Sequence, residues 1–141
     1  MPYEVSWLVD KRIIYFHTSG VATIDDVKAG NKKVMVMLDE GIQFVHLITD
    51  STDVEKVQLG LTDLASVFRD MPASPKMGWS IYVSPKMLDR FFASVTTQMT
   101  KSRHREFNNL ADAVAFLQSV DDTLPEIVLP SRQPQDRSST P

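Results

Sequence analysis

The stretch that decides the fold is Gln43-Phe44-Val45-His46-Leu47-Ile48-Thr49-Asp50-Ser51-Thr52. Its run of large apolar side chains predicts a strand over Phe44–Thr49 that is buried on both faces. Three polar residues follow at its carboxyl end: Asp50, Ser51 and Thr52. Strands buried on both faces belong to sheets that helices cover, and such sheets bind ligands at the carboxyl ends of their strands. The stretch therefore predicts an architecture and the place of a candidate site, but not its chemistry.

Length and composition indicate one ordinary globular domain. The chain has 141 residues, of which 43% are hydrophobic and 23% are charged. It contains no cysteine, which excludes disulfides, thiolate zinc sites and a cysteine nucleophile. The absence of cysteine also indicates a reducing compartment. The net charge of −3 argues against a nucleic-acid partner, because nucleic-acid binders carry a basic surface.

Neither a membrane span nor a secretion signal is expected. No apolar run approaches the ~20 residues that cross a bilayer. The start of the sequence, Met1-Pro2-Tyr3-Glu4, lacks the basic and apolar regions of a signal peptide. These observations predict a cytoplasmic protein.

The chain begins with a predicted β-hairpin. Tyr3–Val9 and Arg12–Thr18 are rich in β-forming residues, and the two residues between them are few enough for a tight turn. Ser19-Gly20 is expected to end the second strand. A helix should then begin after Thr23, a good N-cap, and end at Gly41.

The remaining elements alternate between helix and strand after the strand over residues 44–49. The sequence predicts a helix over 61–68, a strand over 77–83, a helix over 87–99, a strand over 103–107 and a helix from 109 to 117. The order ββαβαβαβα predicts an α/β fold with a mostly parallel five-stranded sheet, an antiparallel first strand and four helices.

The composition changes after Asp122. Residues 1–122 are expected to form the domain, and residues 123–141 a flexible tail rich in proline and serine. Ile127-Val128-Leu129 is the exception, because three apolar residues can dock on the domain or on a neighbouring subunit.

The element order and two local features resemble the SpoIIAA-like fold, which includes the STAS domains. The features are the strand followed by Asp50, and Arg105-Glu106-Phe107 followed by Ala113-Val114-Ala115-Phe116-Leu117. The resemblance covers about residues 3–120 and implies a regulatory protein–protein interaction domain of bacteria. It also implies a phosphorylation switch in a loop that reads Asp-Ser-Ser/Thr-Gly-Leu. Here Gly60-Leu61 matches the end of that loop, but Val57-Gln58-Leu59 offers no hydroxyl to accept a phosphate. The chain therefore resembles a member that lacks the phosphoserine motif.

The candidate ligand site consists of polar residues that follow three predicted strands. Parallel strands place their carboxyl ends at one edge of the sheet, and helix N-termini there offer N–H groups to an anion or carboxylate. The candidate residues are Thr18, Ser19, Asp50, Ser51, Thr52, Ser84 and Lys86. In the competing interpretation Ser84 is a helix cap, and Asp50-Ser51-Thr52 is an Asx-type turn.

The sequence offers no recognisable catalytic set. His17 and His46 lie in strands predicted to be neighbours, but a metal site needs further ligands, so hydrogen-bonded core or interface histidines are expected. A Gly-x-Ser-x-Gly elbow, a phosphate loop and a dinucleotide fingerprint are all missing from the sequence. We expect no catalytic residue, metal or cofactor.

These observations predict a non-enzymatic binding or interaction module that contacts a protein partner or self-associates. One alternative is a carrier of a small apolar or lipid-like ligand, because the predicted helix Met87–Met99 has a wide apolar surface. The other alternative is an uncharacterised enzyme that uses the polar residues at the strand ends.

Overall fold

The computed structural model describes residues 3–58, 60, 62–63, 76–84 and 103–129. The elements in these residues are β1 (Tyr3–Val9), β2 (Ile13–Thr23), α1 (Ile24–Glu40), β3 (Val45–Gln58), β4 (Met77–Val83), β5 (His104–Phe107) and α4 (Leu110–Val120). The helices predicted over 61–68 and 87–99 lie outside the described residues, apart from residues 62–63, which are helical. Neither described helix is long and apolar enough to cross a membrane.

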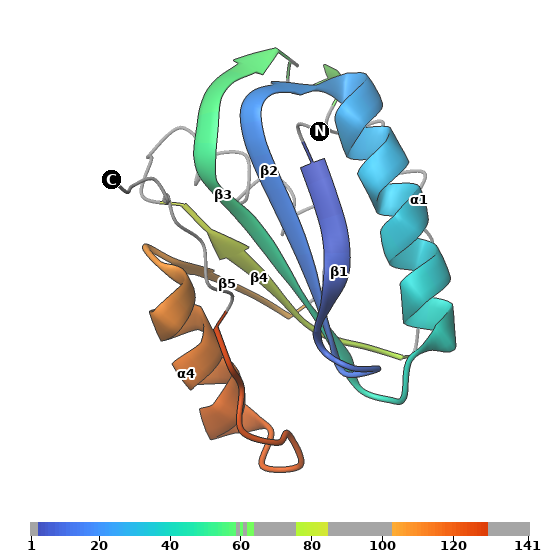
Figure 1. Cartoon of the computed structure of the whole chain (residues 1–141), viewed down its shortest axis with the longest axis vertical. Coiled ribbons are helices and arrows are strands. Elements are labelled where there is room, and N and C mark those ends of the chain that lie inside the picture. The colour runs from blue at the N-terminus through green and yellow to red at the C-terminus, as the bar shows by residue number, and fades with distance from the viewer. Residues whose placement is uncertain (1–2, 59, 61, 64–75, 85–102, 130–141) are drawn as a thin grey trace.

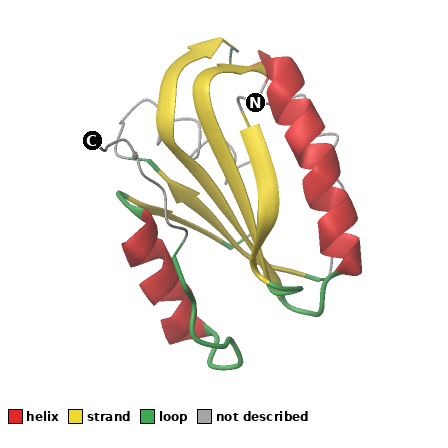
Figure 2. Ribbon diagram, viewed as in Figure 1, coloured by secondary structure: helices red, strands yellow, loops and turns green. Residues whose placement is uncertain are grey.

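The five strands form one sheet in the order β1-β2-β3-β4-β5 (Figure 1). β1 is antiparallel to β2, and the other neighbouring strands are parallel. The predicted mostly parallel sheet with an antiparallel first strand is therefore confirmed. Figure 2 shows α1 and α4 on either side of the sheet.

One face of the sheet, the α1 face, packs against α1. Alternate residues of β2 and β3 contact buried residues of the helix, and the core there consists of Ile14, Phe16, Val34, Leu38, Val45 and Leu47. Gly30 lies inside α1 without breaking it. A Cβ at this position would lie 2.1 Å from the Phe16 ring, so glycine is what allows the helix to approach the sheet closely.

The α4 face packs against α4 through the intervening residues of the same strands. The core there consists of Ile13, Tyr15, Ile48, Ile81, Val83, Ala113, Val114 and Leu117. Trp79 and Phe116 extend it with an edge-to-face ring contact at 4.9 Å between centroids. Asn109 caps α4 by accepting a hydrogen bond from the Asp112 N–H at 2.9 Å, and Thr23 caps α1 in the same way, as predicted.

β2 and β3 are longer than predicted. The expected strand ends at Thr18 and Thr49 are wrong, because the two strands continue to pair as far as Thr23 and Gln58. Two register shifts interrupt this pairing, and Gly20 adopts a φ of +63° between them, so Ser19-Gly20 marks a bulge and not a strand end. The last β3–β4 pair is Asp50 with Val83. Beyond it, β2 and β3 continue together past the end of β4 (Figure 1).

Two apolar residues beyond Asp122 pack on the domain, and the domain boundary expected at Asp122 stays a prediction. Leu124 and Ile127 pack against the α4-face core, while Val128 is 78% exposed. Ile127 thus docks on its own domain, which is one of the two alternatives open for the segment Ile127–Leu129. Residues 130–141 lie outside the described residues.

Candidate functional site

Asp50 lies in the middle of β3, and both oxygens of its carboxylate accept hydrogen bonds from other groups of the protein. The residue is 2% exposed. Its Oδ2 accepts a hydrogen bond from the Tyr15 hydroxyl at 2.6 Å, and its Oδ1 accepts one from the Thr52 N–H at 3.0 Å. The second bond is the local Asx-type contact that the competing interpretation predicted. The expectation that Asp50 follows the end of its strand is wrong, because β3 runs on to Gln58.

The sheet divides the predicted polar cluster between its two faces. Thr18 lies on the α1 face of the sheet, as Ile14 and Phe16 do. Its hydroxyl donates to Ser51 Oγ at 3.3 Å. Asp50 instead lies on the α4 face, as Ile48 does, because successive side chains of a strand point to opposite faces. Only the Asp50 carbonyl oxygen reaches Thr18, at 3.4 Å from its hydroxyl.

The other candidate residues have different surroundings. Ser84 directly follows Val83, is 1% exposed, and donates its N–H to the Phe107 carbonyl at 3.0 Å. Ser19 is half-buried and pairs with Asp53, and Thr52 is exposed. Lys86 lies outside the described residues. The structure thus brings Thr18 and Ser51 into contact, and ligand binding by any of these residues stays a prediction.

A second polar group, which the sequence did not reveal, lies beside Asp50. His17 Nε2 and Asp53 Oδ2 are 2.7 Å apart, and the His17 ring stacks on Tyr15 with 6.1 Å between centroids. The His17 side chain is 14% exposed and that of Asp53 is 49% exposed. Such a pair can orient an imidazole for proton transfer or for binding a polar ligand. In the described part of the chain, no three histidine or acidic side chains are grouped to hold a metal ion.

The two histidines do not lie side by side. His46 pairs with Ile13 and His17 with Asp50, so the two histidines lie four positions apart along the strands. His46 is 3% exposed, and its Nδ1 accepts the Trp79 N–H at 3.0 Å. It is thus the hydrogen-bonded core histidine that the sequence predicted. A Cβ on Gly78 would lie 2.5 Å from Nδ1, so glycine makes room for the ring.

Asp121, the residue that follows α4, completes the surroundings of His46. Its Oδ2 lies 2.8 Å from His46 Nε2 and accepts a hydrogen bond from Arg12 Nη2 at 2.7 Å. Burial alone raises the pKa of Asp121. Hydrogen bonds from Thr123 and His46, together with the charge of Arg12, outweigh that effect and lower the pKa to about 2. Burial lowers the pKa of His46. The pair is therefore an ionised Asp121 with a neutral His46.

Residues 41–44, which we call the apolar loop, join α1 to β3 and expose two large side chains. Ile42 is 63% exposed and Phe44 is 41% exposed. The expectation that Phe44 belongs to a buried strand is wrong, because β3 begins at Val45. The loop backbone is nevertheless held firmly. The Ile42 N–H donates to the Lys11 carbonyl at 2.9 Å, and Arg12 Nε donates to the Phe44 carbonyl at 3.0 Å.

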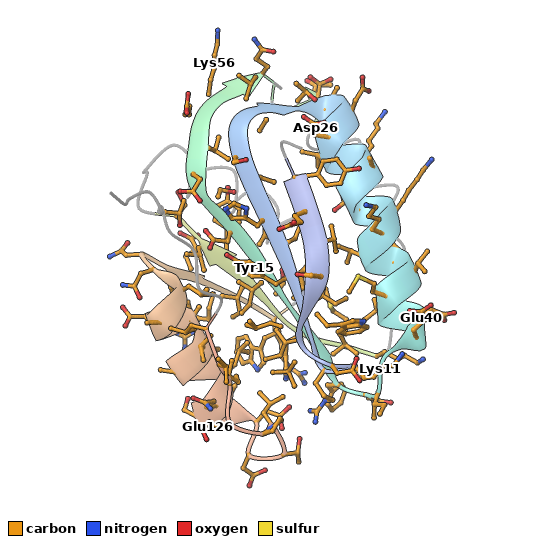
Figure 3. The ribbon with its side chains drawn as sticks, viewed as in Figure 1. Lys11, Tyr15, Asp26, Glu40, Lys56 and Glu126 are labelled. Atoms are coloured by element: carbon orange, nitrogen blue, oxygen red, sulfur yellow. The ribbon has the colours of Figure 1, made fainter. Side chains whose placement is uncertain are left out.

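Lys76, which precedes β4, donates to two carbonyl groups at the end of α1 and the residue after it. Its Nζ donates to the Asp39 carbonyl at 2.6 Å and to the Gly41 carbonyl at 3.4 Å. A cation at a helix C-terminus is also favoured by the helix dipole. The Arg103 guanidinium lies 6.0 Å from the centre of the Phe44 ring. Figure 3 shows Lys11 and Glu40 at this same end of the molecule.

A comparison with solved structures identifies the fold. One match is the crystal structure of an uncharacterized DUF3478-family protein with a SpoIIAA-like fold from Shewanella loihica PV-4. The two structures superpose with a TM-score of 0.58 over 82% of this chain and 91% of that one, at 14% sequence identity. This chain has a SpoIIAA-like fold. No protein-family model and no curated protein matches the sequence.

The SpoIIAA-like fold predicted from the element order is therefore confirmed. At 14% identity the likeness shows the fold alone and carries no function across. Absence of the phosphoserine motif stays a prediction. Gln58, one of the residues at the expected acceptor position, is the last residue of β3.

Proposed function

We propose that this SpoIIAA-like domain is a non-enzymatic interaction module that self-associates through the apolar loop. The observation that carries the proposal is the exposure of Ile42 and Phe44, at 63% and 41%, on a backbone that neighbouring elements hold in place. Clustered apolar side chains at a surface mark interaction sites. Because the loop is already ordered, binding costs little conformational entropy. The cysteine-free composition supports a cytoplasmic location for this module.

The charges around the apolar loop support a second copy as the partner. Lys11 lies beside the loop, where its carbonyl accepts the Ile42 N–H. Asp39 and Glu40 are exposed at the end of α1, directly before the loop. A two-fold contact repeats the same patch on both partners, so it can place the acidic residues of one copy opposite Lys11 of the other. A different protein whose surface carries both acidic and basic residues could bind the same loop, and the experiment must distinguish that case from self-association.

Sedimentation velocity over a concentration series tests the proposal. The wild-type chain should form a dimer, and Ile42→Asp should weaken it by about tenfold or more, because a charge would enter the apolar centre of the contact. Val128→Asp is the matched control, since Val128 is an apolar side chain that is 78% exposed but belongs to the C-terminal segment and not to the apolar loop. A wild-type monomer at the highest attainable concentration would refute self-association. Equal weakening by both variants would refute the loop as the contact.

A second candidate function is a polar ligand or enzymatic site, and the His17–Asp53 pair favours it. Its carboxylate is half exposed, so a ligand can reach it, whereas Asp50 is buried. Asp53→Asn is therefore a cleaner probe than a change at Asp50, which would also disturb Tyr15. If this candidate is right, Asp53→Asn should abolish a host phenotype while the thermal unfolding midpoint stays unchanged. An unaltered phenotype would reject it.

The apolar-ligand alternative rests on Met87–Met99, which lies outside the described residues. Native mass spectrometry of protein purified from its own host tests it. A retained apolar ligand would support the alternative, and a ligand-free mass would count against it.

A further inference from the structure

β1 is an edge strand of the sheet. The strand order places β2 on one side of it, and within the described residues no strand lies on its other side (Figure 1). Residues Tyr3–Trp7 pair with β2 in regular register, and a register shift follows between Trp7 and Val9. In an antiparallel pair, alternate residues direct their N–H and C=O groups away from the partner strand. Tyr3–Trp7 therefore offers a row of backbone donors and acceptors to one more strand.

The sequence of this edge does little to block pairing. Proteins usually protect an exposed edge with lysine, proline or a bulge. Tyr3–Trp7 contains neither lysine nor proline, and the bulge lies beyond it, toward Val9. Its one charged residue, Glu4, lies on the α4 face, because Tyr3 and Val5 pack on the α1 face. The α1 face of the edge is thus left open to an added strand.

The α1 face of the edge is apolar and borders an open hollow on α1. Tyr3, Val5 and Trp7 are partly buried against the α1-face core. The hollow has a volume of about 350 Å³, and the described residues that line it are Lys32, Lys33, Val36 and Met37. Val36 is 60% exposed, and Met37 packs against the same core as β1. An apolar side chain opposite Val5 on an added strand can therefore enter the hollow.

A lysine lies at each end of the edge. Lys33 Nζ is 5.4 Å from the centre of the Tyr3 ring, and Lys11 Nζ is 6.0 Å from the centre of the Trp7 ring. Tyr3 and Trp7 are four residues apart on one face of the strand, which corresponds to about 13 Å. Two carboxylates at positions i and i+4 of an added strand would each face one lysine.

We propose that the free edge of β1 binds an extended segment of a partner protein, in which two acidic residues four positions apart flank a central apolar residue. The segment adds a strand beside β1, its apolar residue enters the hollow at Val36, and its carboxylates pair with Lys33 and Lys11. A second copy of β1 does not fit this description, because Tyr3–Trp7 carries one carboxylate and not two. The proposal does not depend on self-association through the apolar loop.

Chemical-shift titration by NMR on the full chain tests the proposal. The probe is a peptide of sequence Glu-Thr-Val-Thr-Glu with both ends capped. The amides of Tyr3–Trp7 and Val36 should shift as the peptide is added. Replacing both glutamates of the peptide by lysine should weaken binding by about tenfold, because two attractive contacts become repulsive.

Methylation of the peptide backbone separates strand addition from binding through side chains alone. Alternate amides of an added strand point toward β1, and the others point away. One peptide carries methyl groups on the amides of its glutamate and valine residues, and another carries them on the amides of its threonines. One of these peptides should lose binding and the other should keep it. Equal effects of the two methylation patterns would refute strand addition.

Lys33→Glu tests the charge contact, and Lys56→Glu is its matched control. Lys56 is exposed and pairs with Val21, beyond the β1–β2 pair of Tyr3 with Thr18. Lys33→Glu should weaken binding of the glutamate peptide by about fivefold and strengthen binding of the lysine peptide. The control should change neither. Such a reversal of preference is not expected from a merely structural effect of the substitution.

Three further results would each overturn the proposal. The first is the absence of shifts at Tyr3–Trp7 at the highest attainable peptide concentration. The second is the same response in Lys33→Glu and Lys56→Glu. The third is a set of β1 amide shifts in Ile42→Asp that follow the concentration of the protein itself, since second copies would then pair at this edge. Ile42→Asp should bind the peptide as the wild type does, so failure of self-association and failure of this proposal are separate outcomes.

Discussion

His17 and His46 lie on the same face of the sheet, and each meets an aspartate, yet their surroundings differ. His46 is 3% exposed, and both of its ring nitrogens and the facing Asp121 carboxylate are hydrogen-bonded inside the protein. His17 meets Asp53, whose side chain is 49% exposed. The difference shows that a histidine–aspartate contact is not one kind of site. A buried contact stabilises the packing of distant segments of the chain. A half-exposed contact can be replaced by a contact with a ligand at a small cost in stability.

The largest expected effect comes from removing Asp121. Asp121→Ala leaves the buried His46 Nε2 without its acceptor and removes the carboxylate that pairs with Arg12, and breaking such a largely buried pair costs about 3 kcal/mol. The free energy of unfolding from urea titration at neutral pH measures it. A loss below about 0.5 kcal/mol, the range of ordinary surface substitutions, would mean that the contacts of Asp121 add little to the stability of the fold.

Tyr15→Phe should have the next largest effect, because Tyr15 donates to the buried Asp50 carboxylate at 2.6 Å. Taking a hydrogen bond from a buried polar group costs about 1–3 kcal/mol. Thermal and urea unfolding measure the loss. Tyr3→Phe is the control, since the Tyr3 ring also packs on the sheet, in an edge contact with Phe16. Equal effects from both variants would show that the Tyr15–Asp50 bond adds nothing specific.

Acid should weaken the His46 region through Asp121. Its folded-state pKa, about 2, is below the ordinary value of 3.8, so its stabilising contribution is complete above 3.8 and is lost as the pH falls through about 2. The difference in unfolding free energy between the wild type and Asp121→Asn should therefore shrink over that range. A difference that stays constant down to pH 2 would show that Asp121 has an ordinary pKa.

The smallest effect is expected at the His17 region. Asp53→Asn removes the charge of a half-exposed partner, and such surface pairs contribute about 0–1 kcal/mol. The unfolding free energy of this variant should lie close to that of the wild type. A loss as large as that of Asp121→Ala would erase the distinction between the two histidine regions.

The sequence predicted the sheet well because its signals there are local. Thr23 and Asn109 are helix caps in the structure, and the apolar runs mark all five strands. The strand ends were missed because β2 and β3 continue through two register shifts, which depend on the partner strand and not on either sequence alone. Those shifts are also why Asp53 meets His17, a contact with no sequence signal.

The prediction that the polar candidate residues lie together was only partly right, again because the strand ends were misplaced. Thr18 and Ser51 do meet, but Asp50 turns to the opposite face because the strand did not end before it. The sequence places Asp121 just inside the expected domain end at Asp122 and gives it no role. Its contact with His46 spans 75 residues of sequence, and contacts of that range appear only once the chain has folded.

The central claim is that the apolar loop is the surface on which two copies meet, and intermolecular NOEs test it most directly. A sample in which one copy carries labelled isoleucine methyl groups and the other carries labelled phenylalanine rings reports contacts between copies only. We expect NOEs from the Ile42 methyl groups of one copy to the Phe44 ring of the other, and their loss in Ile42→Asp. A dimer that gives no such NOE, or a chain that stays monomeric under these conditions, would contradict the claim.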